Sequence, residues 1–145
     1  MNPILPSLAE DEAFPDPEHT RVVVGLFDSL NGHMQAMAEA HAAGEVERRF
    51  REFASATEIL EDLYAPLDQE SGDDWTRQTA ALYLFVIREL TRAVVENDPA
   101  PIGNGIALIE PVRLAWHALD AQARLAGLAQ RAAIGGRATG WQARI

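Results

Sequence analysis

Apolar residues recur every three or four positions along most of this chain, the spacing that gathers them on one face of an α-helix. Residues 81–98, ALYLFVIRELTRAVVEND, show it most clearly. The main stripe of this helix is Trp75, Leu82, Tyr83, Val86, Ile87, Leu90, Ala93 and Val94. Leu84, Phe85 and Val95 project from the opposite half, among charged residues. A helix with apolar residues nearly all round either lies centrally in a bundle or offers its outer face to a partner, and both interpretations stay open.

A helix is also predicted before this stretch, beginning with Asp16 as N-cap and Pro17 at the first helical position. Gly44 is expected to end it. Its apolar stripe is Val23, Leu26, Phe27, Leu30, Met34, Met37 and His41.

The next helix is predicted from about Glu45 to Tyr64, with Ile59 facing away from its core stripe. That stripe is Val46, Phe50, Phe53, Thr57, Leu60 and Tyr64. The short connection at Gly44 makes these two helices antiparallel. After a polar loop, Ser71 and Asp74 resemble a capping box for the helix over residues 81–98.

The last predicted helix is capped by Asp98 and starts at Pro99 or Pro101. Pro111 is expected to kink or divide it, and an Ala-rich extension is expected to reach about Ala133. Its apolar face is Ile102, Ile106, Ile109, Val112, Trp116 and Leu119.

The sequence therefore predicts an all-α protein, an antiparallel up-down-up-down four-helix bundle with a C-terminal helical extension. We expect one bundle domain over residues 16–133. A flexible acidic tail is expected over residues 1–15 and a flexible basic tail over 134–145, with Trp141 as its one possible anchor.

Charge and composition narrow the function. The net charge is −10, and all 12 cations are Arg. Such an acidic chain argues against nucleic-acid binding. No apolar run is long enough to span a membrane, and no secretory signal is visible. The absence of Cys agrees with a reducing cytoplasm.

Candidate chemistry is sparse. Di-iron bundles carry Glu-x-x-His pairs, but Leu30, Ala38 and Leu114 stand three positions before His33, His41 and His117. Phosphate-binding loops and nucleophile motifs are also absent. We predict no catalytic, cofactor or metal site and no small-molecule substrate.

Residues 82–98 resemble the third-helix signature of the flagellar secretion chaperone family (FliS). The likeness covers about residues 16–119, and Leu84 stands where that family commonly carries an acid. Further similar segments lie, in the family's order, at residues 16–18, 26–28, 97–99, 108–110 and 112–116.

The resemblance implies a cytoplasmic chaperone that binds the disordered C-terminal segment of flagellin, prevents its premature polymerisation and delivers it to the flagellar type III export apparatus. An export-gate component is a further implied partner. The partner-binding residues we expect are Leu84, Phe85, Val95, Met34 and Ile59, although Met34 also suits the core. Ile4, Leu5, Leu8 and Phe14 suggest that residues 1–15 dock transiently on the flagellin-binding groove and compete with flagellin. The alternative for this segment is a simple disordered tail. The alternative function is that of a regulatory or structural adaptor that binds a folded partner.

Overall fold

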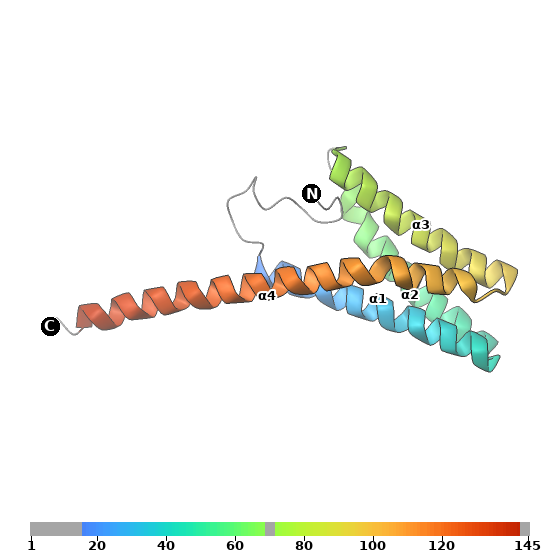
Figure 1. Cartoon of the computed structure of the whole chain (residues 1–145), viewed down its shortest axis with the longest axis horizontal. Coiled ribbons are helices and arrows are strands. Elements are labelled where there is room, and N and C mark those ends of the chain that lie inside the picture. The colour runs from blue at the N-terminus through green and yellow to red at the C-terminus, as the bar shows by residue number, and fades with distance from the viewer. Residues whose placement is uncertain (1–15, 69–71, 143–145) are drawn as a thin grey trace.

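The computed structural model describes residues 16–68 and 72–142 of the chain, and this part is entirely helical apart from short connections. The helices are α1 (Pro17–Ala43), α2 (Val46–Asp68), α3 (Asp74–Glu96) and α4 (Ala100–Gln142) (Figure 1). No helix in these residues is both long enough and apolar enough to cross a membrane.

The helices pack as an antiparallel bundle, as the sequence predicted. α1 packs against α2 and α4, and α3 closes the ring by packing against the same two helices. The connections are short, so each helix returns beside the one before it. α4 is the longest helix and continues well past the start of α1 (Figure 1).

Local capping chemistry fixes most helix ends where the sequence placed them. Asp16 accepts a hydrogen bond from the Glu18 amide at 3.1 Å, and α1 ends at Gly44, whose φ of 72° favours glycine. α3 is capped by Asp73, which accepts from the Thr76 amide at 2.7 Å, so the cap predicted at Ser71 is wrong. Asp98 accepts from the Ala100 amide at 3.0 Å and caps α4 as predicted.

The predicted core stripe of α2 is partly wrong. Val46 is 55% exposed and Phe50 48% exposed, whereas Arg49 is buried. α2 also continues to Asp68, beyond the expected end near Tyr64. The residues of α2 that face the interior are Arg49, Phe53, Ala56, Ile59, Leu60, Leu63, Tyr64 and Leu67. The predicted stripe and the observed inner face both follow the helical period, so the period alone does not tell which one is buried. Packing against the neighbouring helices decides it.

Pro111 was expected to kink or divide α4, and it does not divide the helix. The helix passes through it without a break, and Pro111 itself is exposed. Proline removes one backbone hydrogen bond, but the neighbours Ile109 and Val112 are almost completely buried and hold the helix against the bundle.

The structure describes only part of the two predicted terminal tails. α4 continues past Ala133 to Gln142, so residues 134–142 belong to this helix. Residues 1–15, including Ile4, Leu5, Leu8 and Phe14, and residues 143–145 lie outside the described part, as does the side chain of Trp141.

A buried carboxylate joins α3 to α4. Glu89 is 7% exposed, and its Oε2 accepts hydrogen bonds from Asn104 at 3.2 Å and from Arg92 at 2.9 Å. These hydrogen bonds hold the pKa of Glu89 below its ordinary value of 4.5, and the bond from Asn104 has the larger effect. The ionised form is therefore preferred in the folded state.

This depressed pKa predicts a loss of stability in acid. The contribution of Glu89 to the free energy of unfolding should be complete above pH 4.5. It should disappear as the pH falls through the lower pKa that Glu89 has in the folded state. Glu89→Gln should be less stable than wild type at pH 7 and should lose less on acidification. Urea unfolding of both proteins from pH 7 to about pH 3 measures the difference. If the free energies of unfolding of wild type and Glu89→Gln fell in parallel with pH, the stabilising role of the ionised Glu89 would be contradicted.

Candidate partner-binding surface

An apolar groove opens between the first half of α1, the end of α2 and the start of α3. Its volume is about 280 Å³. Trp116 of α4 also lines it. The lining residues are His19, Val22, Val23, Leu26, Asp62, Leu63, Pro66, Leu67, Trp75, Thr79, Tyr83 and Trp116. Mostly apolar walls with a few polar groups are typical of ligand-binding sites in general.

Stacked aromatic rings form one wall of this groove. Trp116 stacks on Phe27 with ring centroids 6.5 Å apart, and His19 meets Trp116 edge-on at 6.4 Å. Tyr83 lies 6.3 Å from Phe27, and burial raises the pKa of its hydroxyl far above the ordinary value. Tyr83 is therefore neutral at physiological pH and serves packing.

Two indole donors beside the groove have no acceptor. The Nε1 atoms of Trp75 and Trp116 are buried, and neither has a hydrogen-bond partner in the described part of the chain. A buried donor without a partner costs about 1–3 kcal/mol. The free bundle thus carries unmet hydrogen-bonding capacity at this place.

The outer face of α3 is exposed where the sequence predicted it. Leu84 and Phe85 are each 44% exposed, and Val95 is 78% exposed. Leu84 and Val95 share one stripe of the helix, and Phe85 lies on the other flank of the same face. We call these residues the α3 outer face.

The other proposed contacts need correction. Met34 has no exposed surface and lies in the core, so it cannot touch a partner in this state of the bundle. Ile59 was predicted to face away from the core, but it is partly buried and packs against it. Both belong to dense helix packing, which a single helical wheel does not reveal.

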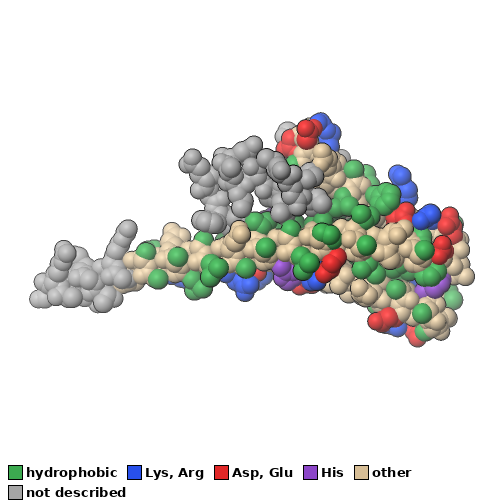
Figure 2. Space-filling model, viewed as in Figure 1, with side chains coloured by type: hydrophobic (Ala, Val, Ile, Leu, Met, Phe, Trp, Pro, Cys, Tyr) green, Lys and Arg blue, Asp and Glu red, His purple; other side chains and the backbone are tan. Residues whose placement is uncertain are grey.

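Sequence reasoning missed a second apolar surface, which runs along the outside of α4. Leu114, Leu125 and Leu128 lie on one side of the helix and are all more than half exposed, whereas Ile134, also more than half exposed, lies on the opposite side. Figure 2 shows apolar side chains following α4 along its length. The first three residues have a spacing of eleven and three positions, close to a heptad pattern that could have revealed the surface.

Charged residues between α1 and α4 satisfy one another. Arg113 donates to Asp28 at 2.9 Å and to both carboxylate oxygens of Glu110, and His117 Nε2 lies 2.8 Å from Asp28. Burial raises the pKa of Asp28, but the hydrogen bonds from His117 and Arg113 outweigh it and leave the pKa below normal. These groups tie two helices together and leave no free acid or base.

Metal ligation has no obvious place either. In residues 16–68 and 72–142, no group of three or more His, Asp or Glu side chains is arranged to hold a metal ion. An apolar groove and an exposed apolar helix face instead define a helical bundle that binds another polypeptide.

Comparison with known proteins gives the family. The chain matches the model of the flagellar protein FliS over residues 12–123 and belongs to that family. The resemblance of residues 82–98 to this family is therefore confirmed. The family consists of flagellar secretion chaperones and not of enzymes.

Three relatives carry the description flagellar secretion chaperone FliS. The Salmonella typhimurium protein is 28% identical over 99 residues, which is 68% of this chain and 73% of the relative. The Vibrio cholerae protein is 26% identical over 90 residues, 60% of this chain and 66% of the relative. The Escherichia coli K12 protein is 34% identical over 64 residues, 43% of this chain and 47% of the relative. The matches thus span 47% to 73% of the length of these relatives.

Proposed function

We propose that this protein is a cytoplasmic chaperone that binds the disordered C-terminal segment of flagellin, prevents its premature polymerisation and delivers it to the flagellar type III export apparatus. The observation that carries this proposal is the FliS family match over residues 12–123, which contains α1–α3 and the bundle portion of α4.

The surfaces of the bundle support binding of an unfolded segment. A disordered segment that becomes helical has an apolar stripe to bury, and a groove beside an exposed apolar helix face can receive it. We propose Leu84, Phe85 and Val95 as contacts. A bound segment also brings backbone carbonyl groups that can accept from the indole donors of Trp75 and Trp116.

Delivery requires a second interaction. We propose that an export-gate component binds the loaded complex. A chaperone that is not consumed must leave after delivery, so this component should recognise the loaded complex more tightly than the free chaperone.

Co-expression with flagellin tests the proposal directly. Full-length flagellin should co-purify with this protein as a soluble complex, and flagellin lacking its C-terminal segment should not. The synthetic C-terminal segment alone should also bind in a titration and gain helical circular dichroism. Equal binding of intact and truncated flagellin would instead favour an adaptor that recognises a folded partner.

A further inference from the structure

Arg49 is a buried cation without a carboxylate partner. Its side chain lies at the end of the bundle where α1 meets α2 and α3 meets α4, and only 8% of the residue is exposed. No Asp or Glu of the described chain pairs with it, although its neighbour Arg48 pairs with Glu39 and Glu45. Burying a guanidinium without a counter-charge is unfavourable unless something else satisfies it.

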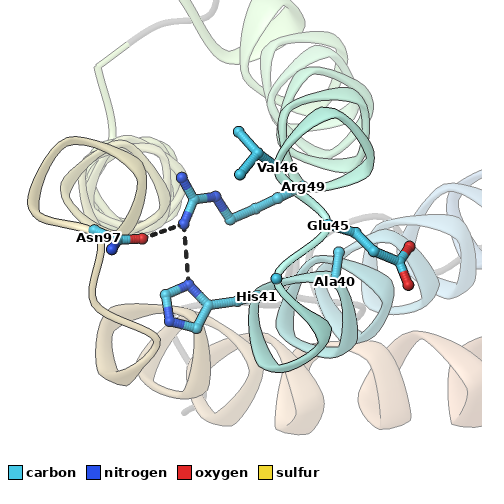
Figure 3. A pocket seen from close by; sticks show the side chains of 7 residues that line it. Ala40, His41, Glu45, Val46, Arg49 and Asn97 are labelled. Carbon is cyan, nitrogen blue, oxygen red and sulfur yellow. Dashed lines mark hydrogen bonds between the residues drawn. The ribbon is translucent and has the colours of Figure 1, made fainter.

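Part of the guanidinium is satisfied. Nη1 donates to Oδ1 of Asn97, the residue that ends α3, and lies 3.1 Å from Nδ1 of His41 (Figure 3). These contacts tie the start of α2 to the ends of α1 and α3. They use one nitrogen and provide no negative charge.

The other edge of the guanidinium has no partner. Nε is buried without a hydrogen bond, and none of the described groups accepts from Nη2. The N–H bonds of Nε and Nη2 lie side by side in one plane, which is the donor fork that binds both oxygens of a carboxylate. The arrangement therefore leaves a complete bidentate donor unused.

This side chain lines a cavity of about 200 Å³. The other lining residues are Ala40, His41, Gly44, Glu45, Val46 and Asn97. Glu45 is directed away from the guanidinium and pairs with Arg48 at 3.6 Å (Figure 3). The cavity is large enough for a carboxylate group.

The start of α2 adds to the positive potential. Asp16, Asp73 and Asp98 cap the other helices, whereas no side chain in the described chain accepts from the first amides of α2. Unfilled amides at a helix N-terminus attract anions. The exposed side chains of Val46 and Phe50 flank the site, with the Phe50 ring centroid 5.6 Å from Cζ of Arg49.

We propose that this cavity, the Arg49 pocket, binds a carboxylate of a bound polypeptide, supplied by its C-terminus or by an Asp or Glu side chain. The carboxylate enters from the Nη2 side, and the side chain of Val46 gives way so that Nε can complete the fork. Val46 and Phe50 then contact the apolar neighbour of that carboxylate.

Acetate is the simplest probe of the full-length chain. Titration of acetate at constant ionic strength should shift the ¹⁵N–¹H resonance of Arg49 Nε, and chloride should not shift it. Replacing chloride by 100 mM acetate should raise the melting temperature by roughly 2–5 °C for a site with a Kd of roughly 20 mM. Phosphate is the competing probe, and a response to phosphate without one to acetate would overturn the proposal, as would no response to acetate.

Two variants locate the effect. Arg49→Lys keeps the positive charge but lacks the planar fork, so it should lose most of the thermal response to acetate. Arg48→Lys is the matched control, since Arg48 is more exposed and already paired, and it should respond like wild type. Equal responses of the two variants would contradict the assignment. The wild-type titration remains valid even where Arg49→Lys folds poorly.

Three short apolar peptides distinguish the sources of the carboxylate. The first has a free C-terminus, the second is amidated and contains one Glu, and the third is amidated and contains no acid. A shift of the Arg49 resonance with the first identifies a terminal carboxylate, and a shift with the second identifies a side chain. A response to acetate but to none of the peptides, or an equal response to all three, would overturn the assignment to a polypeptide carboxylate. None of these measurements involves flagellin, so they succeed or fail independently of the proposed function.

Discussion

Trp116→Ala should lower the free energy of unfolding by about 3–5 kcal/mol, because it removes a large aromatic side chain of the groove wall and opens a cavity. Trp116 is 8% exposed and stacks on the fully buried Phe27. The unpartnered indole N–H should place the loss near the lower end of this range, since its removal relieves a buried donor. Urea unfolding followed by circular dichroism at pH 7 measures the loss.

Two companion variants make this test specific. Trp116→Phe keeps most of the packing and removes the N–H, so it should cost less than about 1.5 kcal/mol. Leu125→Ala changes a residue of the same helix that is 66% exposed and should shift the free energy by less than about 0.5 kcal/mol. Similar losses for Trp116→Ala and Leu125→Ala would show that Trp116 is not part of the core.

Phe85→Asp should weaken binding of the flagellin C-terminal segment by about 1–3 kcal/mol, which is about 5- to 150-fold in Kd. Aromatic side chains are frequent anchors at interfaces, and a carboxylate at this position could not be buried against an apolar segment without loss. We choose Phe85 over Leu84 because the family commonly carries an acid at the position of Leu84. Fluorescence or calorimetric titration with the synthetic segment measures the change.

The fold of this variant should survive. Phe85 is 44% exposed, so its substitution should cost less than about 1 kcal/mol of stability. Leu108→Asp is the matched control, because Leu108 is 38% exposed on α4 rather than α3 and lies outside both apolar surfaces. Its affinity should stay close to wild type. Reduced stability of Phe85→Asp with unchanged affinity would mean that the α3 outer face supports the fold and does not bind the segment.

Much of the candidate surface could be predicted from one helix. Leu84, Phe85 and Val95 were expected outside the main stripe of residues 81–98, and all three are exposed. The period of a single helix is enough to separate its two faces. Met34 was offered for both core and surface, and only the packing of α1 against its neighbours placed it in the core.

The sequence by itself determined the all-α class, the order of the helices, the caps at Asp16, Gly44 and Asp98, and the family resemblance. These depend on the spacing of apolar residues and on side chains within a few positions of the backbone groups that they satisfy. These features depend on residues that are close together in the sequence, so they can be predicted without knowledge of the tertiary structure.

Only the tertiary structure decided which face of α2 is buried, whether Pro111 divides α4, and where the groove lies. Val46 and Phe50 had the right period for a core stripe, but Arg49 takes the inner position because it meets Asn97 and His41. Pro111 is tolerated because the residues beside it are held by other helices. Each outcome depends on contacts between residues far apart in the sequence, whose energies exceed local preferences and are invisible to a pattern along one helix.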